Sequence, residues 1–95
     1  MPASILAHQH QKIRFDAEAG AFVEDAAGDW TIQSLDYFEC QRIFGITDAV
    51  DSVRVTIELG LVACPAGGAA DFLACPLATL VQPLYSAIWA HTRGN

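Results

Sequence analysis

Lysine is almost missing from this chain, and basic residues as a class are scarce. Lysine and arginine together number 5 against 11 aspartates and glutamates, so the formal net charge is −6. Proteins hold nucleic acids and acidic membranes largely through cations that neutralise phosphate groups. The composition therefore argues against direct binding to nucleic acid and against binding to an acidic membrane.

Long hydrophobic runs are missing as well. The most apolar stretch, residues 77–90, contains Pro83, and at about 14 residues it is shorter than the roughly 20 that a membrane-spanning helix needs. Residues 1–10 lack the charged segment followed by an apolar segment that marks a signal peptide. Cysteine occurs 3 times, an odd number that does not suit the disulfide framework of a secreted protein. We therefore expect a cytoplasmic protein with reduced thiols.

Apolar residues are abundant instead. Of the 95 residues, 53% are hydrophobic and 17% are charged, whereas typical globular domains carry about 25% charged residues. A chain of this length has room for one hydrophobic core, so we expect a single domain over residues 1–95 with a frayed terminus over residues 1–10. The low charged fraction predicts that some apolar surface is left for a partner or for a second copy.

Three short segments alternate polar and apolar residues and are separated by turns that contain glycine. They cover residues 11–16, 21–25 and 29–34. Period-two alternation interrupted by such turns predicts a meander of antiparallel strands. The side chains that we expect in the core are Ile13, Phe15, Phe22, Trp30 and Ile32.

Two further elements are predicted in the middle of the chain. Residues 35–44 have the pattern of a helix that is capped by Ser34 and ended by Gly45. Residues 53–63 alternate large apolar residues with polar residues or glycine, and the first half is rich in valine and isoleucine. This alternation predicts a strand with one apolar face.

The last segment has the spacing of helices. Leucines and an isoleucine recur there at steps of four, three, four and four, which places them on one helical stripe. We expect a short helix from Asp71 or Pro76 to Val81, a break, and a second helix that starts at Pro83, with a single kinked helix as the alternative. The order strand, strand, strand, helix, strand, helix predicts an α+β fold. We expect a small two-layer sandwich with a mostly antiparallel sheet of about four strands and helices on one face.

Cysteine and histidine raise the question of a metal or thiol site. Zinc sites usually use two close ligand pairs, but here the cysteines are far apart and no Cys-x-x-Cys motif occurs. Buried cysteines and solvated histidines explain the pattern more simply, so we expect no metal, no cofactor and no catalytic residue. A site could still assemble in space from Cys40, Cys64, Cys75, His8, His10 and His91.

The stretch CPAGGAADFLACP, residues 64–76, contains two glycines before a predicted helix. Backbone N–H groups in such a turn can bind phosphate. No basic residue lies nearby, however, and Asp71 would repel an anion. We interpret the stretch as a connection between two elements.

Acidic residues are concentrated between Asp16 and Asp51. This segment holds nine acids and one base, Arg42, so it carries −8, whereas the rest of the chain sums to +2. Two interpretations remain open: a solvated face that keeps an apolar protein soluble, or a complement to a basic surface on a partner. Aromatic neighbours can supply the buried anchors of such an interface. The expected contact residues are Glu24, Asp25, Asp29, Trp30, Asp36, Tyr37 and Glu39.

The sequence thus favours a non-enzymatic protein-binding module or inhibitor that docks an acidic face on a basic surface, for example one that otherwise holds nucleic acid. Small phage-encoded antagonists of host defence are similar in size and charge, although no motif carries that likeness. One alternative is assembly of a homo-oligomer through the open edge of the predicted strand or through an apolar C-terminal stripe. The other is a small metal- or thiol-dependent enzyme. The residues of the apolar stripe are Leu77, Leu80, Leu84 and Ile88.

Overall fold

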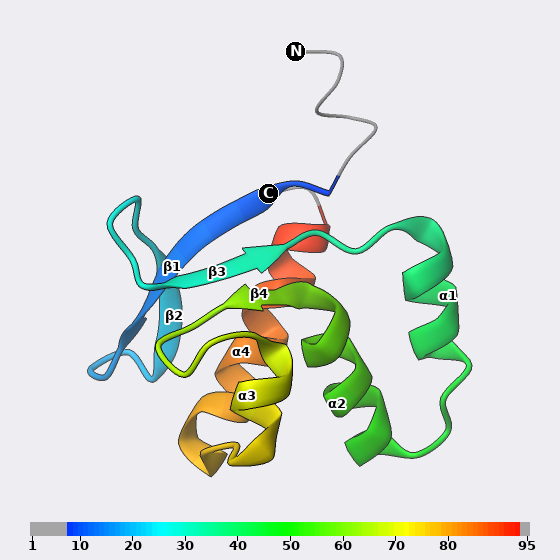
Figure 1. Ribbon diagram of the computed structural model, residues 1–95. Helices are drawn as coiled ribbons and strands as arrows, with labels where there is room; N and C mark the ends of the chain where they lie inside the picture. Colours follow the sequence, from blue (N-terminus) through cyan, green and yellow to red (C-terminus); the bar gives the residue numbers. More distant parts are fainter. Residues whose placement is uncertain (1–7, 94–95) are drawn as a thin grey trace.

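A four-stranded sheet and four helices make up the computed structural model, which describes residues 8–93 (Figure 1). The α+β class with a four-stranded antiparallel sheet is therefore confirmed. In chain order the elements are β1 (His10–Asp16), β2 (Ala21–Glu24), β3 (Trp30–Gln33), α1 (Tyr37–Phe44), α2 (Ala49–Gly60), β4 (Leu61–Ala63), α3 (Ala69–Ala74) and α4 (Ala78–Thr92).

The sheet has the order β2-β1-β3-β4, and each neighbouring pair is antiparallel. The turn from β1 to β2 is tight, and Gly20 adopts a positive φ of 66° in it, a conformation that few other residues accept. Residues of β1 point alternately to the two faces, so Ile13 enters the core while its neighbours Lys12 and Arg14 stay exposed. The meander expected from the sequence is thus the framework of the fold.

Helices α2 and α4 pack against each other and against the sheet. Their fully buried side chains Ile57, Leu84 and Ile88 meet Ile13 and Ile32 of the sheet in one core. Burial of each such side chain stabilises the fold by about 1.5–3 kcal/mol relative to leaving it exposed. Two residues of the predicted apolar stripe, Leu84 and Ile88, are thus buried in this core, whereas Leu77 at its start is 58% exposed. The homo-oligomer interface that the sequence suggested there is therefore wrong for Leu84 and Ile88.

The strand predicted over residues 53–63 is wrong for most of its length, because residues 49–60 form helix α2 and only residues 61–63 form a strand. The helix starts where the Asp48 carboxylate accepts a hydrogen bond from the backbone N–H of Asp51 at 3.0 Å. Thr56, which the strand pattern placed on the polar face, is fully buried. Helix spacing and strand spacing are both present in this segment, and the cap at its start favours the helix.

The C-terminal break is also wrong, since α4 runs through Pro83 without interruption. Proline inside a helix removes one hydrogen bond and costs about 3 kcal/mol. The complete burial of Leu84 and Ile88 after the proline offsets that cost. The helix predicted over residues 35–44 is confirmed with a shift of its start, because Asp36 and not Ser34 is the capping residue.

Hydrogen bonds join the first described residues to the rest of the fold. The backbone of Gln9 bonds with Ser34 in both directions, at 3.0 Å each, and β1 begins at His10. The fraying expected over residues 1–10 stays a prediction, and residues 1–7 lie outside the described part. Among residues 8–93, no helix has the length and apolar character needed to cross a membrane.

Candidate functional site

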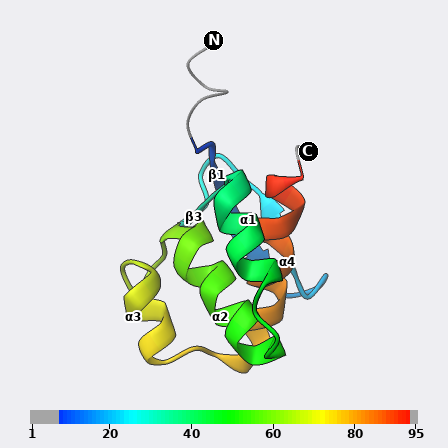
Figure 2. The ribbon, with the colours of Figure 1, turned by 90° about the vertical axis from the view of Figure 1, so that its right-hand side faces the viewer.

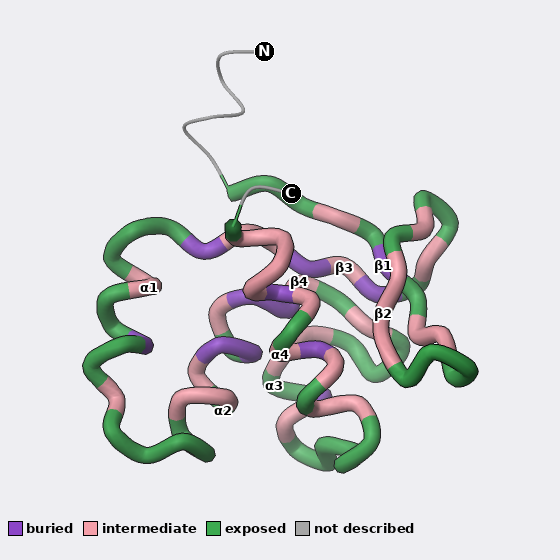
Figure 3. The backbone as a smooth tube through the Cα atoms, turned by 180° about the vertical axis from the view of Figure 1, so that it is seen from behind, coloured by how far each residue is buried: buried purple, intermediate pink, exposed green. Residues whose placement is uncertain are grey.

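Helix α1 stands at one end of the molecule and shows most of its surface to solvent (Figures 1 and 3). Its inner side carries the buried Ile43 and the half-buried Cys40, which pack at the margin of the core. Figure 2 shows the helix in front of α2 and α4. Three aromatic side chains lie on its outer side with exposed fractions of 68% for Tyr37, 79% for Phe38 and 67% for Phe44. A short helix that exposes three aromatic rings is the least expected feature of this surface.

The exposed rings of α1 belong to two groups of rings in contact, one at each end of the helix. Tyr37 and Phe44 are seven residues apart, so they share a helical stripe, and Phe38 packs edge-on against Tyr37 with ring centroids 5.3 Å apart. Phe44 stacks on Trp89 of α4 with centroids 5.6 Å apart, and Trp89 contacts Tyr85. The exposed side chains of this helix are called the α1 face below, and they are Tyr37, Phe38, Gln41, Arg42 and Phe44.

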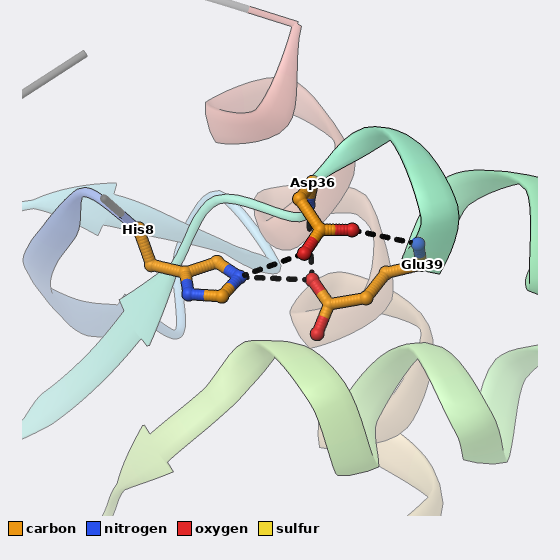
Figure 4. Close-up of side chains that lie close together, drawn as sticks. All are labelled: His8, Asp36 and Glu39. Atoms are coloured by element: carbon orange, nitrogen blue, oxygen red, sulfur yellow. Dashed lines mark hydrogen bonds and ion pairs between the residues drawn. The ribbon is translucent and has the colours of Figure 1, made fainter. Parts of the chain in front are cut away.

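A capping box fixes the acidic end of α1. The Asp36 carboxylate accepts from the backbone N–H of Glu39 at 2.8 Å, and the Glu39 carboxylate accepts from the backbone N–H of Asp36 at 2.9 Å. His8 Nε2 lies 3.0 Å from Glu39 Oε1 and 3.7 Å from Asp36 Oδ2 (Figure 4). Both carboxylates lie at the positive end of the helix dipole, which stabilises their negative charge next to the aromatic rings.

The same three side chains are the group in residues 8–93 whose ligand atoms converge closely enough for a metal ion, within 4.8 Å of one another. Each carboxylate already accepts a helix N–H, and a cation at this end of a helix meets the positive end of the dipole. Capping and the contact with His8 account for the arrangement. His10 lies apart from it and lines a polar hollow of about 430 Å³ with Glu24 and His91.

The acidic residues between Asp16 and Asp51 do not form one patch. Glu24, Asp25 and Asp29 lie at and beyond the end of β2, across the molecule from α1 (Figure 1). The Asp25 carboxylate is partly neutralised by Arg14, whose Nε donates to it at 2.9 Å. The structure thus brings Asp36, Tyr37 and Glu39 together and places the other predicted acids elsewhere.

Trp30 is not available as an anchor, and that prediction is corrected. Its side chain is 8% exposed and lies in the core between the rings of Phe22 and Phe72, with centroids 5.0 Å and 5.7 Å away. The inward-facing position on β3 explains this burial. Phe38, which is one of the aromatic neighbours that the sequence offered as an anchor, is exposed, and so is Phe44, which the sequence did not single out.

No family model, curated protein or solved structure matches this chain. Its surface chemistry is therefore the guide to function. Contiguous exposed apolar surface with polar groups at its margin is typical of protein interaction sites. The α1 face, with Asp36 and Glu39 at one end and Arg42 at the other, has this character.

A second apolar feature is a groove of about 270 Å³ between α2, the end of α3 and α4. Val53 and Ile57 line it from α2, and the exposed Val50 stands at the start of that helix. The groove was missed because these residues were assigned to a strand. Pockets that bind small molecules usually have about 300–1,000 Å³, so this groove lies just below that range.

Residues 64–76 contain a tight turn and then helix α3, between β4 and α4. Cys64 and Gly67 exchange two backbone hydrogen bonds of 2.7 and 2.9 Å, and Gly67 has a positive φ of 129°. The Asp71 carboxylate accepts the N–H of Gly68 at 2.9 Å. A phosphate would have to displace that carboxylate, which disfavours the cradle interpretation.

The three cysteines are free, and they differ in environment. Burial, and then the nearby carboxylates of Asp36 and Glu39, raise the pKa of the Cys40 thiol above its usual value. Cys75 is exposed at the end of α3. Because the thiolate is the reactive form, a raised pKa leaves less of it at neutral pH and slows reaction.

Cys75 is therefore expected to react first with iodoacetamide at neutral pH and Cys40 much more slowly. A labelling time course read by peptide mass spectrometry measures the order. The variant Asp36→Asn/Glu39→Gln keeps both caps but removes two charges, so it should speed the labelling of Cys40. Labelling of Cys40 as fast as that of Cys75 would contradict the expectation.

Proposed function

We propose that this protein is a non-enzymatic protein-binding module that docks its α1 face on a basic surface of a partner protein. The observation that carries the proposal is the exposure of three aromatic side chains on one two-turn helix beside two fixed carboxylates. Tyr37, Phe38 and Phe44 are the proposed anchors. Asp36 and Glu39 are the proposed charge contacts.

The aromatic part supplies affinity. Tyrosine and tryptophan are among the residues that dominate measured interface energies, and aromatic rings bury about 150–250 Å² each when covered. The rings of the α1 face are about two-thirds to four-fifths exposed, so they offer roughly 400 Å² to a partner. A standard interface buries about 800 Å² per partner, so the contact must extend beyond α1.

The charged part supplies orientation and association rate. Arg42 is a single base on a helix that begins with two acids, and the whole chain carries −6. Complementary charge steers encounter and disfavours wrong partners more than it adds affinity. Glu24, Asp25 and Asp29 are proposed to contribute only to this long-range steering, because they lie across the molecule from the α1 face.

The proposed partner is a cytoplasmic protein whose basic surface otherwise holds nucleic acid. Such a surface presents cations that bind phosphates, and carboxylates are the anionic groups that this chain offers to them. Occupation of that surface is the proposed mode of inhibition, and small acidic antagonists encoded by phages are similar to this chain in size and charge alone. The three free thiols favour a reducing compartment. A thiol enzyme that uses Cys40 as its nucleophile is less well supported, because a raised pKa is the opposite of what a nucleophilic thiol needs.

A pull-down from native lysate with matched charge variants tests the proposal. Asp36→Asn/Glu39→Gln removes two charges at α1 and keeps the capping box, while Glu24→Gln/Asp29→Asn removes two charges at the other end. The wild-type protein is expected to retain a nucleic-acid-binding protein at low salt and less of it at high salt. The α1 variant should retain several-fold less, and the distant variant should resemble the wild type.

An aromatic variant separates the two parts of the interface. Phe38→Ser is expected to weaken binding at least about tenfold at any salt concentration, since truncation of an anchor costs more than about 1.4 kcal/mol. Titration of the captured partner by calorimetry measures this loss. Unchanged binding by Phe38→Ser and by the α1 charge variant would refute docking through this face. A partner lost only with the distant variant would move the interface to the end of β2.

A further inference from the structure

We infer that the α1 face also pairs with the α1 face of a second copy, with the two helices antiparallel about a two-fold axis. The inference does not rest on the proposed function, because it concerns a second copy of this chain and not a foreign partner. It rests on how charge and aromatic rings are ordered along α1.

The charges along α1 are complementary to those of a second α1 that runs in the opposite direction. Asp36 and Glu39 stand at the start of the helix, and Arg42 stands in its last turn. Arg42 is exposed and has no ion pair within residues 8–93, whereas Arg14 and Arg54 each pair with an aspartate. An antiparallel second helix brings its acidic start to this unpaired guanidinium, and the contact occurs twice by symmetry.

The helix dipoles and the rings favour the same orientation. In an antiparallel pair the positive end of each helix lies beside the negative end of the other. Tyr37 and Phe44 stand at opposite ends of one stripe, so the reversal places Tyr37 of one copy against Phe44 of the second copy. A parallel pair would instead place Arg42 of one copy against Arg42 of the other, and the like ends of the two helix dipoles would lie side by side.

The available area predicts a weak dimer. Roughly 400 Å² of aromatic surface per copy gives a total near 800 Å², which is below the standard interface and within the range of transient contacts. The protein is therefore monomeric at low concentration and dimeric at high concentration. A partner that covers more surface displaces the second copy, so self-pairing shields the rings only until such a partner binds.

Sedimentation across protein concentrations from about 10 µM to about 1 mM tests the pairing. The wild-type mass is expected to rise from the 10.2 kDa monomer toward twice that value. Arg42→Glu should weaken the dimer about two- to thirtyfold, the range for two exposed ion pairs, and Tyr37→Ser should weaken it at least about tenfold. A monomer at every concentration, or a dimer indifferent to both variants, overturns the inference and leaves the docking of a foreign partner untouched.

Cross-linking tests the orientation. Gln41 lies at the middle of α1, so in an antiparallel pair it faces its own counterpart, while Gly45 at the end of the helix does not. Cysteines are introduced as Gln41→Cys or Gly45→Cys after replacement of the native cysteines by alanine or serine. Mild oxidation is expected to cross-link the first variant and not the second. Cross-linking at both positions indicates a parallel pair and refutes the proposed arrangement.

Discussion

Replacement of Thr56 by aspartate is expected to destabilise the fold by at least about 3 kcal/mol, which is a large fraction of the roughly 5–15 kcal/mol that holds a domain of this size folded. Thr56 is fully buried on the inner side of α2, and its hydroxyl donates to the carbonyl of Ser52 at 2.8 Å. An aspartate there would bury a charge without a cation to pair with. Urea unfolding followed by circular dichroism measures the loss.

Two variants of the same helix serve as controls. Val50→Asp adds the same charge at a position that is 67% exposed in the first turn of α2, where a carboxylate favours the helix dipole, so stability should change by no more than about 0.5 kcal/mol. Thr56→Val keeps the shape and removes one hydroxyl, which should cost about 1 kcal/mol or less. Tolerance of Thr56→Asp would mean that Thr56 faces solvent, as in the strand that the sequence predicted.

Helix α2 shows why the alternation of residues 53–63 was misleading. Val53, Ile57 and Leu61 are four residues apart, so the same apolar residues that alternate along a strand also form a helical stripe. Sequence periodicity cannot decide between the two in a short apolar run. The deciding signal was Asp48 with Asp51 three residues later, which marks the start of a helix and was not used.

The meander and the helix over residues 35–44 could be predicted because their signals were local. Glycine-containing turns and period-two alternation specify a hairpin without reference to the rest of the chain. The length of β4 and the continuity of α4 through Pro83 depend on packing in three dimensions instead. Burial of Leu84 and Ile88 outweighs the tendency of Pro83 to break a helix, and the spacing of residues in the sequence does not predict this outcome.

The sequence predicted several of the residues of the candidate site, but it did not predict where the fold places them. The acids around α1 and the aromatic Tyr37 were identified from the sequence, but their separation from Glu24 and Asp29 is set by the path of the chain through β3. Trp30 and Phe38 are both aromatic residues in an acidic segment. One is inward-facing on a central strand and the other is outward-facing on a helix, and only the fold distinguishes them.

Gly60 is expected to be as intolerant of alanine as a well-packed core position, although alanine is the better helix former by about 1 kcal/mol. It is the last residue of α2 and is buried where that helix crosses α4. A Cβ at this position would overlap the side chain of Ile88, which is itself fully buried and has no room to withdraw. Overpacking of this kind costs about 1–3 kcal/mol, and the helix propensity of alanine offsets up to about 1 kcal/mol of it, so Gly60→Ala should lower the free energy of unfolding by up to about 2 kcal/mol.

Gly45 provides the matched control for that substitution. It also ends a helix, its φ is −79°, and a Cβ there would meet only the carbonyls of Gln41 and Arg42 at 3.5 Å or more. Gly45→Ala should therefore be neutral or stabilise the fold by up to about 1 kcal/mol, because it reduces the freedom of the unfolded chain. Denaturant midpoints of the two variants measured together give the comparison. Equal effects would mean that α2 and α4 can separate at their crossing without loss, and the close approach at Gly60 would then not be required by the fold.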